Sequence, residues 1–96
     1  MLILVVYDIE TVTPSGKDRL RRVARACEAV GRRIQNSVFE CIFDAAQFRA
    51  FRQRLTLMID PQTDSLRFYN LGNSYRAKVQ DTHPEAVLFQ EDPLIL

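Results

Sequence analysis

The stretch Leu2-Ile3-Leu4-Val5-Val6-Tyr7-Asp8 decides the fold, because six consecutive apolar or aromatic positions end in a carboxylate. A run that is apolar at both parities predicts a strand buried on both of its faces. The open end of such a central strand is a common place for polar chemistry. Asp8 is therefore the first candidate for a functional residue.

A helix is expected over residues 15–30. Ser15, followed three residues later by Asp18, is compatible with an N-cap and an acid in the first turn, and Gly31 is a typical helix stop. One apolar stripe recurs at helical spacing and consists of Leu20, Val23, Ala24 and Cys27. Three arginines fall on the side away from that stripe and should face solvent: Arg21, Arg22 and Arg25.

The rest of the chain completes the order βαββαβ, the split βαβ arrangement of ferredoxin-like α+β domains. The elements are strands at residues 33–35 and 38–43 around an Asn36-Ser37 turn, a helix through Phe48, Phe51 and Leu55 that ends before Pro61, and a strand at residues 65–71. Residues 1–96 form one predicted domain with its core at residues 1–72. The extension at residues 73–96 contains short apolar runs and is expected to add a strand to a sheet edge, either its own or a partner's.

In this architecture both helices cover one face of the sheet and leave the other face bare. The first strand would then expose a row of aliphatic side chains, either Leu2, Leu4 and Val6 or the alternate set. Burying such a row would be favourable by several kcal/mol, at about 25 cal/mol per Å² of apolar surface. A back-to-back homodimer is the simplest prediction.

The net charge is only +1, but positive charge gathers in one segment. Residues 17–33 hold seven basic side chains against two acidic ones. Cys27 and Cys41 lie in apolar segments without a zinc-binding spacing, and are expected to be buried thiols in a reducing compartment. The short apolar start fits neither a signal peptide nor a membrane span, so a cytoplasmic protein is expected. No catalytic Ser/His/Asp set, phosphate-binding glycine loop or dinucleotide fingerprint is present.

Two segments carry a family resemblance. Tyr7-Asp8-Ile9 after the first strand, the arginine-rich helix, and residues 31–40, which read Gly-Arg-Arg-Ile-Gln-Asn-Ser-Val-Phe-Glu, together resemble the second CRISPR-associated protein family. The resemblance implies a ferredoxin-like homodimer with Mg²⁺ or Mn²⁺ held by the aspartate of the first strand. It also implies phosphodiesterase activity, and a role as a scaffold that carries DNA for the CRISPR integrase during spacer insertion.

Carried over residue by residue, the resemblance assigns Asp8 as the metal ligand. It places four residues near the active cleft: Tyr7, Arg33, Ser37 and Phe39. It also implies that Arg19 or Arg22 contacts the nucleic-acid backbone. The full set of expected nucleic-acid contacts is Arg19, Arg21, Arg22, Arg25 and Arg33. One carboxylate is too little for a metal site, but two copies of Asp8 could meet at a dimer axis and share one ion with waters.

Three functions are consistent with these residues. The first is a metal-dependent endonuclease for RNA or DNA, and arginines that contact phosphate do not distinguish the two. The second is a scaffold for the CRISPR integrase that binds nucleic acid without cleaving it. The third is a ferredoxin-like dimer that senses a small molecule, which leaves the arginines of the first helix unexplained.

Overall fold

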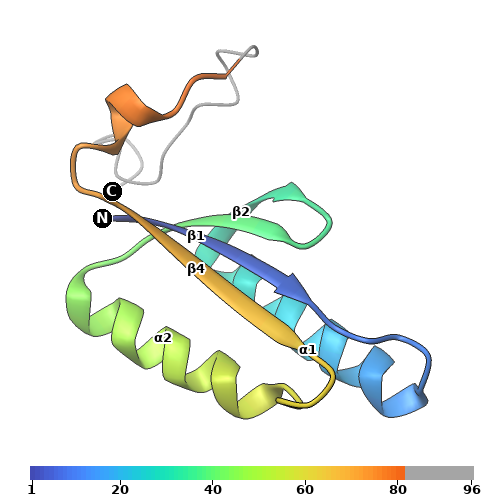
Figure 1. Cartoon of the computed structure of the whole chain (residues 1–96). Helices are drawn as coiled ribbons and strands as arrows, with labels where there is room; N and C mark the ends of the chain where they lie inside the picture. The colour runs from blue at the N-terminus through green and yellow to red at the C-terminus, as the bar shows by residue number, and fades with distance from the viewer. Residues whose placement is uncertain (82–96) are drawn as a thin grey trace.

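The computed structural model describes residues 1–81 of the chain. Its elements are β1 (Leu2–Asp8), α1 (Pro14–Val30), β2 (Gly31–Gln35), β3 (Val38–Ile42), α2 (Ala45–Met58), β4 (Ser65–Gly72) and the short 3₁₀-helix η1 (Tyr75–Lys78). The four strands form one antiparallel sheet in the order β2-β3-β1-β4. The predicted α+β, ferredoxin-like arrangement is therefore confirmed, with β1 and β3 in the middle (Figure 1).

β1 is the most buried strand, as its apolar sequence predicted. Ile3 and Val5 are fully buried and Tyr7 is only 2% exposed, because these side chains face the layer formed by α1 and α2. Val23 of α1 and Leu55 of α2 are also fully buried in this core. Asp8 is the last residue of β1, so it lies at one end of the sheet, opposite Ser65 of β4.

The helix α1 begins earlier than predicted. Its N-cap is Thr13, not Ser15, and the Thr13 side-chain oxygen accepts a hydrogen bond from the Gly16 N–H at 3.0 Å. Pro14 occupies the first helical position, where its missing N–H costs no hydrogen bond. Ser15 therefore lies inside the first turn.

No loop separates α1 from β2, since the helix ends at Val30 and the strand begins at Gly31. A Cβ added at Gly31 would lie 2.7 Å from the Glu40 carbonyl oxygen and 2.5 Å from the Cys41 sulfur. The predicted helix stop is confirmed, and its physical reason is this close approach of β3. The backbone φ of Gly31 is −142°, which is ordinary extended geometry.

The second helix and the hairpin agree with the sequence. α2 buries Phe51 and Leu55, and its start is fixed by Asp44, which forms a capping box with Gln47. The hairpin β2–β3 turns at residues 36–37. No helix within residues 1–81 is long and apolar enough to cross a membrane.

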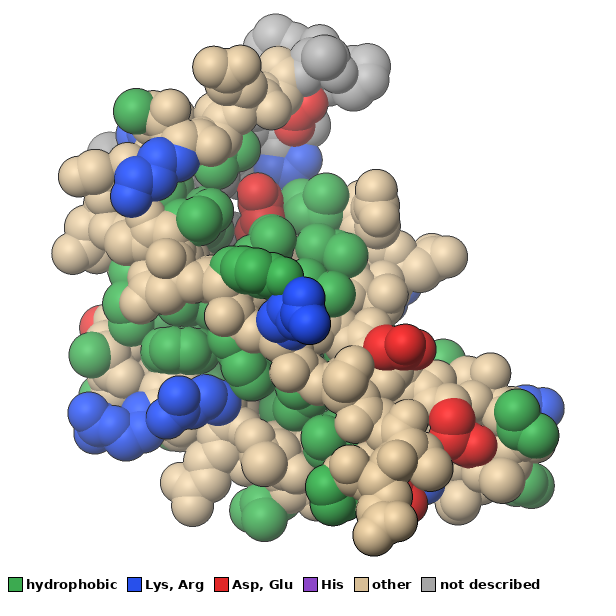
Figure 2. Space-filling view, viewed as in Figure 1, with side chains coloured by type: hydrophobic (Ala, Val, Ile, Leu, Met, Phe, Trp, Pro, Cys, Tyr) green, Lys and Arg blue, Asp and Glu red, His purple; other side chains and the backbone are tan. Residues whose placement is uncertain are grey.

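The sheet face opposite the helices is only partly bare. Leu4 and Val6 are partly exposed there, but Leu2 is fully buried and packs with Tyr75 of η1. Figure 2 shows hydrophobic side chains gathered in the middle of the view, interrupted by a few charged groups. The expected row of three exposed aliphatic groups is thus shortened to two by the chain's own C-terminal segment.

The predicted extra strand lies mainly outside the described residues. Residues 73–81 contain η1 and no strand. The apolar runs at residues 87–89 and 94–96, on which the extra strand was predicted, fall in the undescribed part.

Candidate active site and nucleic-acid surface

Asp8 ends β1 with an exposed side chain. It shares the parity of Leu4 and Val6, so it stands on the side of the sheet away from the helices. Within residues 1–81 its carboxylate has no hydrogen bond or ion pair. An exposed carboxylate without a partner is available to an external cation.

A cleft of about 430 Å³ lies beside Asp8, between α1 and the tip of the β2–β3 hairpin. It brings together five of the residues that the sequence singled out. Its lining consists of Tyr7, Asp8, Ile9, Leu20, Arg21, Ala24, Arg33, Asn36 and Ser37. The floor is largely apolar and two arginines lie among the polar groups, which suits a ligand with both an apolar part and negative charge.

Tyr7 lines this cleft, and Phe39 packs behind Tyr7 without lining the cleft itself. Phe39 is fully buried and its ring lies 6.1 Å from that of Tyr7 in a stacked arrangement. The Tyr7 hydroxyl donates to the Asn36 carbonyl at 3.1 Å, and the Tyr7 N–H donates to the Ser37 carbonyl at the same distance. Burial raises the pKa of Tyr7 above its usual value. These contacts hold the hairpin tip against β1.

Arg33 is held at the rim of the cleft. One of its nitrogens donates to Glu28 at 2.9 Å and another to the Asn36 carbonyl at 3.1 Å, while its guanidinium lies 4.9 Å from the centre of the Phe39 ring. A guanidinium has five N–H donors, so donors remain for a phosphate oxygen.

The outer face of α1 is basic, as predicted. Arg21, Arg22 and Arg25 are exposed and line a shallow hollow of about 470 Å³ together with Asp18. Arg21 is paired with Asp18. Arg22 and Arg25 have no hydrogen bond or ion pair within the described part of the chain. Their charge is uncompensated locally, which suits contact with phosphates.

Arg19 differs from the other arginines of α1 and makes a contact that the sequence analysis did not foresee. Its Nε donates to Asp64 Oδ2 at 2.7 Å, and the side chains of the two residues are 13% and 0% exposed. The structure therefore turns Arg19 inward, away from the nucleic-acid contact predicted for it. A signal existed, because Arg19 lies one helical turn before the buried Val23.

Sequence reasoning also missed the arginines of α2. Arg49, Arg52 and Arg54 are exposed, and residues 45–58 contain no acidic side chain. Arg52 lies over the Phe48 ring at 5.6 Å. A charge count over this helix would have found this second basic surface.

The metal-ligand prediction rests on Asp8 alone in one chain. Among the described residues, no group of three or more His, Cys, Asp or Glu side chains comes together. Glu10, the nearest acid in sequence, is engaged by the Thr13 hydroxyl and by the Thr13 N–H at 3.2 Å. Burial raises the pKa of Glu40, on β3, above its usual value. The carboxylate of Asp8 is the kind of hard oxygen ligand that Mg²⁺ prefers. One chain offers only this ligand, so waters or a partner chain must supply the others.

The cysteines take no part in this site. Cys27 and Cys41 are free and fully buried, and burial raises the pKa of each thiol to about 12. The predicted buried, unpaired thiols are confirmed, and such thiols are poor nucleophiles and metal ligands.

Asp64 is an acid whose environment predicts a pH-dependent stability. Burial alone raises the pKa of its carboxyl, but hydrogen bonds from Arg19 and from the N–H groups of Asp60 and Glu10 outweigh it and hold the pKa below the usual 3.8. A lowered folded-state pKa stabilises the fold at neutral pH, and this contribution is lost as the pH falls below about 5. We expect the melting temperature of the wild type to fall more steeply between pH 7 and pH 3 than that of Asp64→Asn. If the melting temperatures of the two proteins fall equally with pH, this assignment is contradicted.

Comparison with known proteins gives the family. The family model for CRISPR associated protein Cas2 matches residues 1–79. A protein of Halalkalibacterium halodurans named CRISPR-associated endonuclease Cas2 is 48% identical over 95 residues, which cover 99% of each chain. One from Chlorobaculum tepidum named CRISPR-associated endoribonuclease Cas2 is 46% identical over the full length of both chains.

A solved structure agrees with these relatives. The crystal structure of Streptococcus pyogenes Cas2 at pH 6.5 matches with a TM-score of 0.74 and 48% identity, covering 86% of this chain and 100% of that one. The similarity thus includes the fold, the cleft-forming segments and nearly the whole length of the chain. This chain belongs to the Cas2 family of CRISPR-associated proteins.

Proposed function

We propose that this chain is a divalent-metal-dependent endonuclease that cleaves RNA or DNA during CRISPR spacer acquisition. The observation that carries the proposal is Asp8, an exposed carboxylate with no partner within residues 1–81. It borders a cleft that also contains Arg21 and Arg33. Relatives named endonuclease and endoribonuclease support the reaction class.

The site would be completed by a second copy of the chain. Asp8 stands on the same side of the sheet as Leu4 and Val6, whose partial exposure favours a back-to-back homodimer. Two carboxylates related by a two-fold axis could then hold one Mg²⁺ or Mn²⁺, with waters filling the remaining positions. Without an ion, the two like charges would repel each other.

In the proposed mechanism the chain supplies binding and orientation. A bound Mg²⁺ or Mn²⁺ would neutralise charge on the scissile phosphate and acidify an attacking water. Asp8 would hold the ion, and Arg33 presents guanidinium donors from a position fixed by Glu28 and Asn36. Tyr7 and Phe39 act as positioning residues, because their contacts keep the hairpin tip, and thus Arg33 and Ser37, beside Asp8.

The test of this function is a cleavage assay on matched RNA and DNA, single-stranded and duplex, with and without Mg²⁺ or Mn²⁺. The proposal expects cleavage that requires the ion and disappears in Asp8→Asn. Metal-independent cleavage, or equal cleavage by the variant, would point to a contaminating nuclease. The same assay assigns the preferred nucleic acid.

A scaffold for the CRISPR integrase is the second candidate. Arg22 and Arg25 of α1, with the arginines of α2, offer more basic groups than one scissile phosphate requires. A scaffold would keep supporting spacer integration after Asp8→Asn, whereas the nuclease role would be lost. The small-molecule sensor has no comparable support, because it leaves both basic helices without a role.

The α1 arginines are expected to dominate nucleic-acid binding. Changing Arg22 and Arg25 together to glutamine should weaken binding and reduce the slope of log K against log[salt] by about 2, since each lost phosphate contact lowers the slope by about 0.9. The measurement is a filter-binding titration across a salt series.

The matched control changes Arg49 and Arg54 of α2 to glutamine. These are also two exposed arginines without a hydrogen bond or ion pair in the described residues, so the change in net charge is the same. A smaller effect is expected, because Arg22 and Arg25 share a hollow on α1 with Arg21, which also lines the cleft beside Asp8, whereas neither α2 residue lines that hollow or the cleft. Equal loss from both pairs would mean that only total charge matters and would contradict the assignment to α1.

A further inference from the structure

We propose that Asp64 is a positioning residue for Asp8. Through its ion pair with Arg19 and its hydrogen bond to the Glu10 N–H, it fixes the backbone that carries Asp8 and thereby sets the affinity of this site for a divalent ion. The inference rests on the proposed role of Asp8 as a metal ligand. No resemblance or sequence pattern had assigned a role to Asp64.

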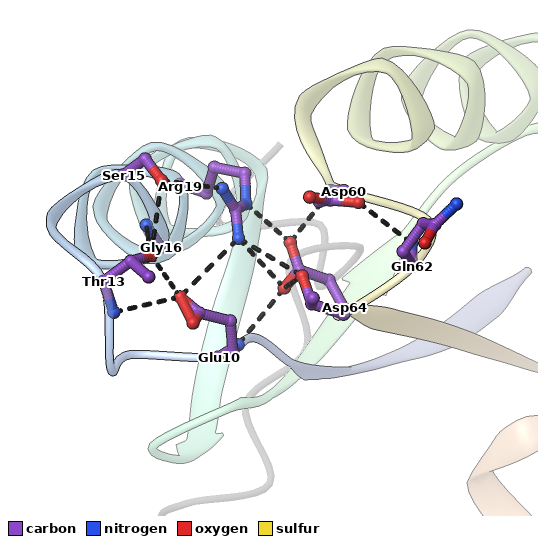
Figure 3. A network of polar contacts seen from close by, with 9 residues as sticks. Glu10, Thr13, Ser15, Gly16, Arg19, Asp60, Gln62 and Asp64 are labelled. Carbon is purple, nitrogen blue, oxygen red and sulfur yellow. Dashed lines mark hydrogen bonds and ion pairs between the residues drawn. The ribbon is translucent and has the colours of Figure 1, made fainter.

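Asp64 is the centre of a polar network at one end of the sheet (Figure 3). Its side chain is 0% exposed and accepts hydrogen bonds from Arg19 Nε at 2.7 Å, Asp60 N at 2.9 Å, Thr63 Oγ1 at 3.1 Å and Glu10 N at 3.2 Å. A second nitrogen of Arg19 lies 3.4 Å from the other carboxylate oxygen. The carboxylate is therefore well satisfied although it is buried.

The network joins three segments of the chain that meet around Asp8. Asp64 directly precedes Ser65, which is the β4 partner of Asp8, and it binds the N–H of Glu10, two residues after Asp8. Arg19 adds the first turns of α1. The position of Asp8 is thus fixed on two sides, through its sheet neighbour Ser65 and through Glu10 further along the chain.

The network continues into the loop between β1 and α1. The Glu10 carboxylate binds the hydroxyl and N–H of Thr13, and Thr13 in turn caps α1 through the Gly16 N–H. A Cβ at Gly16 would collide with the Glu10 carbonyl oxygen, so the loop lies directly on the helix. The chain leaving Asp8 therefore has little freedom to move.

A buried ion pair is poor evidence for stability by itself, because an apolar pair of similar volume often stabilises a fold equally well. An apolar side chain at position 64 could not accept a hydrogen bond from the N–H groups of Glu10 and Asp60. What the carboxylate adds is a fixed position for these two loops. In a dimeric site built from single carboxylates, small displacements of each Asp8 would change the distance between the two ligands.

The test is Asp64→Asn in the full-length protein. The variant keeps the side-chain size but loses the charge and one acceptor oxygen. We expect Mn²⁺ binding, measured by the electron paramagnetic resonance signal of free Mn²⁺, to weaken about 10-fold, as for other residues that orient metal ligands. Without metal, hydrogen exchange of the Glu10 N–H should become faster. Cleavage should recover at saturating Mn²⁺, so the change appears in the metal requirement and not in kcat.

Val23→Ala is the matched control for lost stability. Val23 is fully buried in the core and has no part in the network, so its truncation should lower the melting temperature without changing Mn²⁺ affinity or Glu10 exchange. If Asp64→Asn folds poorly, Arg19→Lys gives a milder form of the same test, because it keeps the positive charge and loses the Nε donor.

The outcomes separate this inference from the proposed function. Wild-type Mn²⁺ affinity in Asp64→Asn, or Glu10 exchange no faster than in Val23→Ala, would overturn the positioning role. If the wild type binds no Mn²⁺ at all, the metal function itself fails and this inference fails with it. Faster Glu10 exchange would then show only that Asp64 fixes the loop.

Discussion

Replacing Asp8 with asparagine is expected to lower Mg²⁺- or Mn²⁺-dependent cleavage by about 100-fold or more, since even residues that only orient metal ligands contribute 10- to 100-fold. Asparagine keeps the size of the side chain but replaces a charged oxygen by an amide nitrogen, which cannot bind a cation. The Asp8 carboxylate has no partner within the described residues, so the fold should lose little stability. Initial cleavage rates across a metal titration, together with melting temperatures, provide the measurement.

Asp44→Asn is the matched control for this change. It removes one exposed carboxylate at the opposite end of the sheet, next to the residues of β3 that pair with the start of β1. Asparagine is as good an N-cap as aspartate, so α2 should keep its start. Cleavage should stay at the wild-type rate. Comparable losses in both variants would mean that Asp8 acts only through net charge and would remove the metal site from the proposal.

Leu4→Glu is expected to convert the proposed homodimer into monomers and to abolish cleavage. Leu4 lies in the middle of the helix-free face, opposite Glu40 of β3 and Tyr69 of β4. A glutamate there would bury a charge in the proposed interface and place it beside another acid, which costs several kcal/mol. Leu4 is only partly buried within one chain, so each monomer should still fold. Sedimentation velocity measures assembly, the metal-dependent cleavage assay measures activity, and circular dichroism checks that the monomer is folded.

Leu57→Glu controls for the chemical change. Leu57 is 81% exposed on α2, on the other layer of the protein, and the same substitution there should leave assembly and cleavage unchanged. If Leu4→Glu remains a dimer, the helix-free face is not the interface. If it becomes monomeric and still cleaves, a single Asp8 is sufficient and the shared ion is wrong.

The sequence predicted the fold because its strongest patterns are local. The apolar run of β1 and the apolar stripe of α1 each predict which side chains are buried, and neither prediction needs information about distant residues. The start of α1 was misplaced because two N-cap signals compete there. Thr13 and Ser15 are both good N-caps, and Pro14 decides for Thr13 because it is best placed in the first helical turn.

The site was predicted in part, mainly from the family resemblance and not from local patterns. Tyr7, Asp8, Arg33 and Ser37 do share one cleft, together with Arg21. The pairing of Arg19 with Asp64 joins positions 45 residues apart, and no periodicity relates them. Helical spacing could place Arg19 on the inner side of α1, but only the folded chain supplies its partner.

The direct joint between α1 and β2 has a mechanical consequence. Because Val30 is followed at once by Gly31 and β3 lies against that glycine, the joint has no hinge. Helix α1, which carries Arg22 and Arg25, and the β2–β3 hairpin, which carries Arg33, should therefore move as one rigid unit. A polyanion that binds the arginines of α1 and displaces the helix would then also displace Arg33. Binding at the outer face of α1 and the shape of the cleft beside Asp8 would thus be coupled.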